Sequence, residues 1–202
     1  MNPASGGASI DGSAYRYVVD LARHSPGPLD TTIEAWSAYG LALFALLMVL
    51  AWWRARRTGA PEALTALAVP VVVVVAYLVN DVLKTLVRED RPCQTLRVRT
   101  LEACPAHGDW SFPSNHAAIA AAAAVALLFV SRRLGALACL AAVAMAASRV
   151  WVGVHYPHDV LAGVVVGAVV ALGSMSLLHA RSATLAGRLA TAPPLRVLLS
   201  AS

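Results

Sequence analysis

Five long apolar runs divide the chain, and its polar residues gather between them. The runs cover residues 33–53, 62–83, 114–131, 134–152 and 160–179. About twenty consecutive apolar residues in a helix span the hydrocarbon core of a bilayer, and each run is close to that length. The pattern therefore predicts an all-α fold, a polytopic transmembrane helical bundle with about five spanning helices.

Composition supports this interpretation. Of the 202 residues, 58% are hydrophobic and 13% are charged, and the mean hydropathy is +0.65. In soluble domains about a quarter of the residues are charged. All five tryptophans lie near the ends of the apolar runs, where aromatic side chains gather at the membrane surface. We therefore expect contacts with membrane lipids and none with nucleic acid.

The two ends of the chain differ from its apolar middle. The first thirty residues have no apolar core and no small-residue cleavage site, so we expect no cleaved signal peptide. Within them, apolar side chains recur at helical spacing beside charged ones, which predicts an amphipathic helix in the membrane interface. Its apolar members are Tyr15, Val18, Val19 and Ala22. We expect an N-terminal interfacial arm (1–32), a transmembrane domain (33–180) and a basic cytoplasmic tail (181–202).

Charged residues predict the orientation in the membrane. Lysine and arginine divide eight and eight between the two sides, but ten of the eleven acids fall on one side. Topology follows mainly the cations in short loops, and the compact basic turns are at 54–57 and 131–133. We expect these turns in the cytoplasm. The N-terminus and the 84–113 loop then lie outside the plasma (inner) membrane, where the site described below would also face.

Two of the three cysteines, Cys93 and Cys104, share the outer loop, and Cys139 lies inside an apolar run. In an oxidising compartment the first two can form a disulfide, which we favour. Two unpaired thiols remain the alternative at this level.

Polar residues cluster at the outer ends of the predicted helices, first in the segment 80–92. Lys84 and Arg91 are seven residues apart, which on a helix places them about 20° from alignment on one face. Arg88 lies on the same stripe, and Pro92 ends the helix. Taken alone, these cations would be expected to extend toward lipid headgroups.

A second cluster is Pro-Ser-Asn-His at 113–116. Ser114 or Asn115 can cap the helix that starts there, leaving backbone N–H groups and the positive helix end pointing outward. Such a terminus binds anions, and His116 in the first turn could donate a proton to the bound group. An ordinary N-cap beside an interfacial histidine is the alternative.

The third cluster lies in the segment 148–160. His155 and Asp159 are four residues apart, so the carboxylate can hold one imidazole nitrogen and leave the other basic. Arg149 adds a bidentate donor suited to phosphate oxygens. The alternatives are that Asp159 only balances the charge of Arg149, and that His158 is a solvated loop residue.

Together the three clusters are more informative than any one alone, because ionisable groups at the membrane edge are functional by default. Three cations, a helix N-terminus and two histidines describe a site for a dense anion. One histidine can attack phosphorus while the other protonates the leaving oxygen, and the cations stabilise the charge on the equatorial oxygens.

A metal site is the main competing interpretation of these side chains. His116, His155, His158 and Asp159 are all potential ligands. We expect no metal and no other cofactor, because the neighbouring cations would repel a divalent ion and no second acidic cluster offsets them.

The three clusters resemble the signature motifs of a known family. KTLVREDRP, PSNH and SRVWVGVHYPHD are similar to the motifs of the type 2 phosphatidic-acid phosphatase superfamily. That superfamily contains membrane lipid phosphate phosphatases and soluble vanadium haloperoxidases. All three motifs occur in order between residues 84 and 159, and three spaced motifs are highly specific.

The resemblance implies a role for each residue. His155 would be the nucleophile that forms a phosphohistidine, His116 the general acid, and Asp159 the residue that orients His155. No metal is expected in the membrane branch of the superfamily. The phosphate-binding residues would be Lys84, Arg91, Ser114, Asn115 and Arg149.

The chain departs from the family pattern at Asn115, where glycine is usual. Glycine permits positive φ and close approach of the backbone to an anion, and asparagine is the next residue to tolerate that conformation. We expect the cradle to survive, with the asparagine side chain crowding or contacting the phosphate.

The predicted function is hydrolysis of a lipid (di)phosphate at the outer membrane face, with apolar helices beside the site admitting the lipid tail. The chain most resembles bacterial polyprenyl-diphosphate phosphatases, which implies undecaprenyl or another polyprenyl diphosphate as substrate. Phosphatidate, phosphatidylglycerol phosphate and polyprenyl phosphoribose phosphate are alternatives. Vanadate-dependent halide oxidation is disfavoured by the membrane spans. A transporter or non-catalytic anion binder would place its polar groups at mid-span rather than at helix ends.

Overall fold

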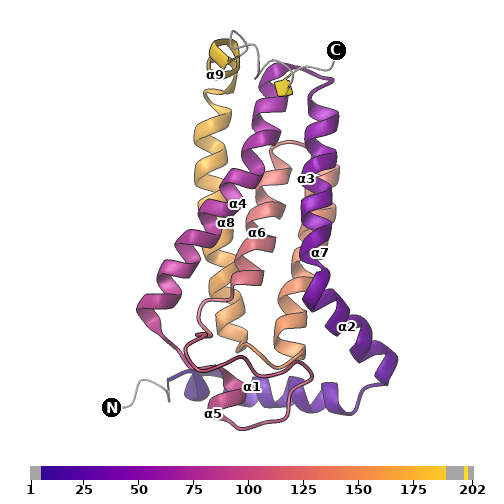
Figure 1. Cartoon of the computed structure of the whole chain (residues 1–202), viewed down its shortest axis with the longest axis vertical. Helices are drawn as coiled ribbons and strands as arrows, with labels where there is room; N and C mark the ends of the chain where they lie inside the picture. The colour runs from indigo at the N-terminus through magenta and orange to yellow at the C-terminus, as the bar shows by residue number, and fades with distance from the viewer. Residues whose placement is uncertain (1–5, 190–197, 200–202) are drawn as a thin grey trace.

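The computed structural model describes residues 6–189 and 198–199, and this part of the chain is helical, without strands. The all-α prediction is therefore confirmed for the described residues. Figure 1 shows a bundle along the long axis, with α1 lying across one end and α9 at the other. We call these the α1 end and the α9 end. The helices are α1 (Gly6–Arg23), α2 (Gly27–Tyr39), α3 (Leu41–Ala55), α4 (Ala60–Val87), α5 (Pro92–Thr95), α6 (Asn115–Leu128), α7 (Arg132–Trp151), α8 (Pro157–His179) and α9 (Ser182–Leu189).

Helix α6 forms the middle of the bundle and contacts α3, α4, α7 and α8. Its sequence, NHAAIAAAAAVALL, is mostly alanine, and short side chains let neighbouring helices approach closely. The sequence of α6 therefore explains its central position.

Two glycines of α8 bring its backbone against α6. A Cβ atom on Gly163 would collide with the carbonyl oxygen of Ser114, and one on Gly167 would collide with that of Ala118. Only glycine permits this approach. The contact fixes the start of α8, which carries Asp159, beside the first turn of α6.

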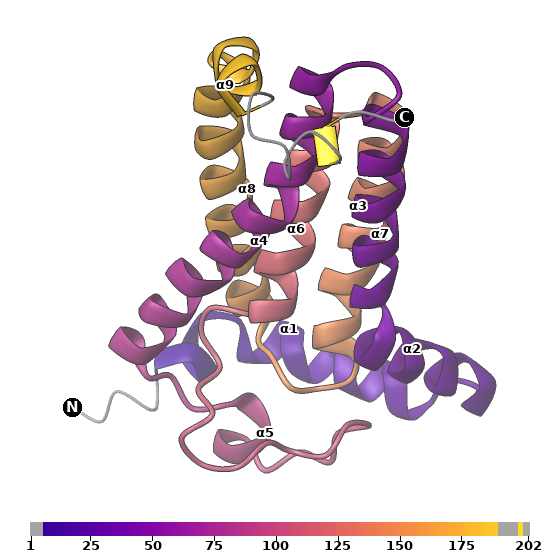
Figure 2. The same ribbon diagram turned by 45° about the horizontal axis from the view of Figure 1, so that its top comes forward.

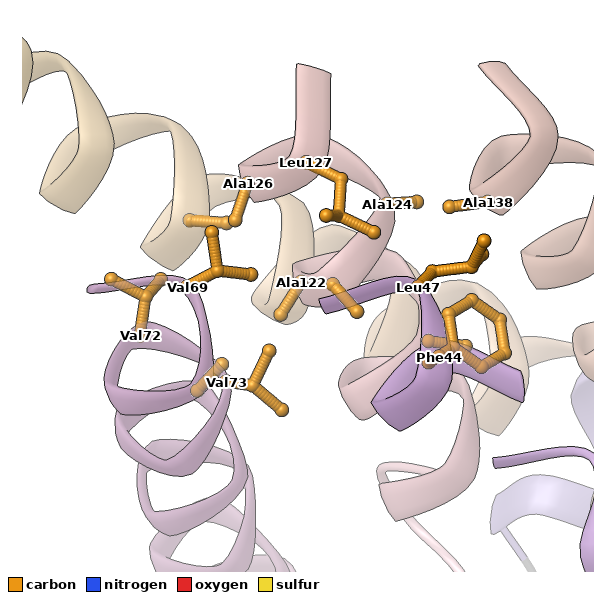
Figure 3. Close-up of a cluster of buried hydrophobic side chains, with 14 of the residues drawn as sticks. Phe44, Leu47, Val69, Val72, Val73, Ala122, Ala124, Ala126, Leu127 and Ala138 are labelled. Atoms are coloured by element: carbon orange, nitrogen blue, oxygen red, sulfur yellow. The ribbon is translucent and has the colours of Figure 1, made fainter. Parts of the chain in front are cut away.

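Toward the α9 end the bundle has an apolar core, drawn in Figure 3. Leu47 of α3 lies beside Ala138 of α7, with Phe44 one turn earlier on α3, and Val69 of α4 lies beside Ala126 of α6. All five side chains are at most 4% exposed. The polar site and this core therefore occupy different parts of the same bundle.

The number of candidate membrane spans differs from the five predicted. Helices α4, α7 and α8 are long and apolar enough to cross a bilayer, and α2 with α3 makes a fourth candidate that bends by 53°. Helix α6 is apolar but has only 14 residues, about 21 Å at 1.5 Å per residue, which is shorter than a typical hydrocarbon core. Each of the five predicted runs forms helix, but α6 by itself is too short to span a bilayer, and α3 reaches spanning length only together with α2.

Helix α1 coincides with the predicted amphipathic segment, but its apolar face contacts the protein. Tyr15, Val19 and Ala22 are at most 2% exposed; Tyr15 and Val19 pack with Tyr156 and Val160 near the start of α8. The Tyr15 hydroxyl also donates to the carbonyl of Gly153 at 2.7 Å. The residues that predicted contact with the membrane interface instead attach α1 across the α1 end of the bundle.

The segment 181–202, which we predicted to be a tail, includes helix α9. This helix packs against α4. Most of the rest of that segment lies outside the described residues. The domain boundaries at 32 and 180 stay predictions.

The loop between α4 and α6 covers part of the α1 end. Cys93 and Cys104 form a disulfide within it, and the Gln94 side chain donates to the carbonyl of Pro105 at 2.8 Å. The Glu102 N–H donates to the carbonyl of Val152, which attaches the loop to the turn before His155.

Candidate active site

All eight residues predicted for the site lie at the α1 end of the bundle. Lys84, Arg91, Ser114, Arg149, His155 and Asp159 are buried, and Asn115 and His116 are half-buried. They come from the end of α4, the loop after it, the start of α6, the end of α7 and the start of α8. Helix packing therefore brings together three motifs that are separate in the sequence.

His155 and Asp159 form the centre of the site. The imidazole Nδ1 lies 3.4 Å from the carboxylate of Asp159, and Nε2 lies 3.3 Å from a guanidinium nitrogen of Arg91. An arginine can only donate, so Nε2 is the acceptor and Nδ1 carries the hydrogen toward Asp159. This tautomer leaves the Nε2 lone pair on the side of Arg91.

The protonation of His155 fits the same arrangement. Burial lowers the pKa of His155 to about 3, although the hydrogen bond and charge of Asp159 act to raise it. The imidazole is therefore neutral near pH 7, and Nε2 is available as a nucleophile.

Asp159 is held by more than its histidine. Its Oδ2 accepts hydrogen bonds from the Ser111 hydroxyl at 2.5 Å and from the backbone N–H of Tyr156 at 2.7 Å. Sequence analysis missed Ser111. Its position two residues before the Pro-Ser-Asn-His motif was the only available signal, and a serine there has many ordinary roles.

The start of α6 forms a cradle of unused donors. The first N–H groups of a helix have no partner within it, and no side chain caps this terminus. The Ser114 hydroxyl and the Nε of Arg149 are buried and find no hydrogen-bond partner among the described residues. Buried donors normally have partners, so these fit an anion such as phosphate.

Arg91 reaches the site by a route that differs from the predicted one. Helix α4 ends at Val87, Arg88 adopts a left-handed conformation with φ of 54°, and Arg91 is extended. The predicted helical stripe through Arg91 is therefore wrong, because a residue before proline avoids the helical region. The loop instead folds back onto the site, where the N–H of Ser111 donates to the carbonyl of Glu89 at 2.7 Å.

Hydrogen bonds to backbone carbonyls hold Lys84 and Arg91 in place. The Lys84 ammonium donates to the carbonyl of Trp110 at 2.7 Å. Arg91 donates to the carbonyl of Val154 at 3.0 Å, next to His155. These bonds bind the loop and the turn 152–156 into one unit around the site.

Arg91 and Arg149 also pair with carboxylates from the loop between α4 and α6. Arg91 pairs with Asp109 at 2.9 Å, and Arg149 pairs with Glu102 at 3.0 Å. Burial acts to raise the pKa of Asp109, but the hydrogen bond and charge of Arg91 outweigh it and hold the pKa below its usual value. The charge of Arg149 is balanced by Glu102, which removes the alternative role that we considered for Asp159.

The side chain of Asn115 points away from the cradle. Its amide oxygen accepts from Asn80 at 2.6 Å, and its amide nitrogen lies 3.5 Å from Asp81. Asn115 is the first residue of α6 and does not have positive φ. The side chain therefore joins α6 to α4, and its crowding of or contact with a phosphate stays a prediction.

His116 lies in the electric field of the three predicted phosphate-binding cations. The charges of Arg149, Arg91 and Lys84 each act on its imidazole. Its ring makes no hydrogen bond to the described residues, so it is free to meet a bound group.

His158 is not a solvated loop residue, the alternative that we considered for it. Its ring stacks on Tyr156 and Phe112, with centroids 5.3 and 5.9 Å away. Its nitrogens lie 2.9 Å from Asp11 and 3.1 Å from Glu89. His158 therefore connects α1 to the loop after α4.

Among the described residues, Glu89, His158 and Asp159 are the group of side chains that could hold a metal ion, with ligand atoms within 4.8 Å of one another. Both nitrogens of His158 already contact carboxylates, and Asp159 serves His155. A metal would have to displace one of these contacts.

Comparison with known proteins assigns the chain to a family. The model of the PAP2 superfamily matches residues 63–183. The chain is 33% identical over 157 residues to the undecaprenyl-diphosphatase BcrC of Bacillus subtilis, covering 77% of this chain and 78% of that protein. It is 37% identical over 132 residues to the decaprenylphosphoryl-5-phosphoribose phosphatase of Mycobacterium tuberculosis, covering 65% and 67%.

Solved structures show the same fold. The crystal structure of Aquifex aeolicus LpxE matches with a TM-score of 0.64 at 24% identity, covering 81% of this chain and 93% of that one. The PAP2 type phosphatidylglycerolphosphate phosphatase of Bacillus subtilis matches with a TM-score of 0.60 at 21% identity, covering 85% and 89%. The chain belongs to the PAP2 superfamily and is a multi-pass membrane phosphatase.

Proposed function

We propose that this protein removes a phosphate from a membrane lipid through a phosphohistidine at His155, with undecaprenyl or another polyprenyl diphosphate as the substrate. The observation that carries the mechanism is the pairing of His155 with Asp159, at the start of α8, beside the N-terminus of α6. There the Ser114 hydroxyl and the Nε of Arg149 are buried donors without described partners.

The reaction follows from the donors and acceptors of the site. Nε2 of His155 attacks phosphorus, and the bond from phosphorus to the leaving oxygen breaks as His116 protonates that oxygen. Asp159 stabilises the imidazole as it becomes positive. Water then attacks the phosphohistidine with His116 as base, which releases inorganic phosphate and restores both histidines. The phosphate oxygens are bound by Lys84, Arg91, Arg149, Ser114 and the backbone N–H of Asn115.

The substrate class is supported by the relatives and by the surroundings of the site. The BcrC relative that aligns over most of both chains is named an undecaprenyl-diphosphatase. The M. tuberculosis relative acts on a decaprenyl lipid according to its name, so a polyprenyl chain is common to both. Polyprenyl phosphoribose phosphate is therefore the second candidate, ahead of phosphatidate and phosphatidylglycerol phosphate.

We also propose that the site faces the outside of the plasma membrane. The basic turns at 54–57 and 131–133 join helices at the α9 end, opposite the site, and such turns stay in the cytoplasm. A disulfide in the loop beside the site suits an oxidising compartment. In this arrangement α6 completes five membrane-embedded helices and α1 lies at the outer surface.

The test is phosphate release by the detergent-purified protein in excess EDTA. Polyprenyl diphosphate, polyprenyl monophosphate, polyprenyl phosphoribose phosphate and phosphatidate are compared side by side, with His155→Ala as control. Release that resists EDTA and is abolished in His155→Ala supports the proposal, and the preferred lipid identifies the substrate. Loss of activity in EDTA, or no release from any lipid, would contradict it.

A further inference from the structure

An apolar groove lies between α2 and α7 near the α1 end. It has a volume of about 330 Å³, and its walls include Ile33 and Trp36 of α2 and Ala144, Ala147 and Trp151 of α7. The small alanine side chains leave its floor open on the α7 side.

The groove exists because α2 diverges from the bundle. Helices α2 and α3 meet at a 53° bend at Gly40, and Figures 1 and 2 both show α2 leading away from α7 beyond it. A Cβ atom on Gly40 would lie 2.8 Å from Met145 of α7. At Gly40 the chain is therefore in close contact with α7, and from there toward the α1 end the distance between α2 and α7 increases.

The groove presents hydrocarbon rather than polar groups. The hydroxyl of Thr32 donates to the carbonyl of Pro28, and that of Ser148 donates to the carbonyl of Met145. The indole N–H of Trp151 donates to Asp30 at 3.0 Å. Only the indole N–H of Trp36 lacks an acceptor among the described residues. A hydrocarbon chain is the occupant that such a surface suits.

The two walls of the groove lie next to the predicted phosphate site along the chain. Ser37, the residue after Trp36, is fully buried and accepts a hydrogen bond from Arg149, the residue after Ser148. The two walls therefore meet at a predicted phosphate-binding arginine. A lipid in this groove would place its phosphate end at Arg149.

A second apolar groove provides a comparison. It lies between α3 and α4, has a volume of about 250 Å³ and is lined by Ala45, Met48, Trp52 and Leu67 among others. It includes no residue of the predicted site and no neighbour of one. Apolar character alone therefore does not single out the α2–α7 groove; its connection to Arg149 does.

We propose that the groove between α2 and α7 binds the part of the substrate's polyprenyl chain that adjoins the phosphate. The inference rests on the proposed function and extends it, because it assigns chain recognition to α2 and α7. Ala144 and Ala147 then set the space available to the chain.

The test fills the groove and compares two substrates that share a headgroup. Ala144→Leu and Ala147→Leu are assayed with undecaprenyl diphosphate and with methyl diphosphate, a short substrate that keeps the diphosphate and has no isoprene unit to enter the groove. We expect the KM for the long chain to rise about tenfold or more, since a few methylene groups in an apolar site have effects of that size. Turnover of the short substrate is expected to stay within about twofold.

The controls are Ala45→Leu in the α3–α4 groove and Ala136→Leu, which adds the same side chain at an exposed position of α7. Both are expected to leave the KM for the long chain unchanged. If the groove variants behave like the controls, or lose both substrates equally, the proposed chain site is wrong. If the wild-type protein hydrolyses neither diphosphate, the proposed function itself fails.

A direct measurement does not depend on the variants. A polyprenyl phosphate with a photoreactive group in its first isoprene unit is crosslinked to the wild-type protein and the labelled peptides are identified. Labelling within 27–39 and 144–151 supports the groove. Labelling confined to α3 and α4 would contradict it and indicate ordinary membrane-lipid contact.

Discussion

The two ends of helix α6 differ in what their side chains do. In its first turn, Ser114 and His116 present a hydroxyl and an imidazole without described partners. Toward the α9 end, Ala122, Ala126 and Leu127 are completely buried among apolar neighbours (Figure 3). The N-terminal end of α6 has hydrogen-bond donors without described partners, whereas the residues at its C-terminal end have no polar side chains.

The difference suggests that activity depends on the polar groups at the α1 end of α6, whereas stability depends on the packing of its apolar side chains. Unused buried donors are unfavourable for folding, so the site is maintained by the packing around it. Changes at the α1 end should therefore alter turnover more than stability, and changes in the α6–α8 contact should do the opposite. Each prediction below tests that separation.

The largest effect is expected from removing the nucleophile. His155→Ala should lower kcat by at least about 10⁴-fold, because no other group can form the phosphohistidine, while the apparent Tm in detergent changes little. The matched control is His179→Ala, an exposed histidine at the other end of α8. Turnover by His155→Ala within tenfold of wild type would exclude the proposed nucleophile.

The next effect concerns stability. Gly167→Leu forces a side chain into the carbonyl of Ala118 and should lower the free energy of unfolding by about 3 kcal/mol. Gly173, in the same helix, has open space around it, so Gly173→Leu should be close to neutral. The measurement is thermal unfolding in detergent. Equal Tm values for the two variants would show that the α6–α8 contact is not close.

Acid should destabilise the site through His155. Its pKa falls from the ordinary 6.5 to about 3 on burial, so the unfolded chain binds a proton that the folded chain does not. The resulting stability is complete above pH 6.5 and is lost as the pH falls toward 3, by at most about 1.4 kcal/mol per pH unit. His155→Gln cannot be protonated. Its Tm should therefore decrease less than that of wild type between pH 6.5 and 4, and parallel curves would contradict this account.

A smaller effect is expected from Ser111, which positions Asp159. Ser111→Ala removes one of the bonds to Oδ2 and should lower kcat about tenfold with little change in KM, since the phosphate-binding groups stay in place. Thr65→Ala is the control, because among the described residues this buried hydroxyl bonds to Pro61 within α4 and to nothing in the site. An increase in KM without a decrease in kcat would instead place Ser111 in substrate binding.

The sequence predicted the fold class and the composition of the site because both depend on patterns along the chain. Apolar runs identify buried or membrane helices, and the spacing of His155 and Asp159 fits one helical turn. The order of the three motifs added the family. None of these inferences required knowledge of distant contacts.

What the sequence did not predict depends on contacts between distant segments. Glu102 and Ser37 meet Arg149 only because the disulfide loop and α2 fold to the same place. The burial of Tyr15 against α8 could not be separated from membrane contact, since both favour the same apolar face. Arg91 lies next to His155, but it reaches that place through a returning loop and not along the predicted helical stripe.

The smallest expected effect is at Asn115, where the two functions of α6 meet. Asn115→Gly introduces the residue usual in the family, keeps the backbone N–H and removes the bond to Asn80. Glycine at a helix start has little propensity cost, so the loss should be about 1 kcal/mol of stability from the missing hydrogen bond. Activity should stay within about threefold of wild type, because the substitution keeps the backbone N–H and removes a side chain that is bonded to α4.

The control for this change is Asn80→Ala, which removes the same bond from the α4 side. It should lower the Tm by at least as much as Asn115→Gly, since Asn80 also donates to the carbonyl of Pro113 at 3.2 Å. If Asn115→Gly instead lowers kcat tenfold or more at unchanged Tm, the asparagine side chain takes part in catalysis. The first turn of α6 would then be specialised for this chain's own substrate rather than joined to α4 for support.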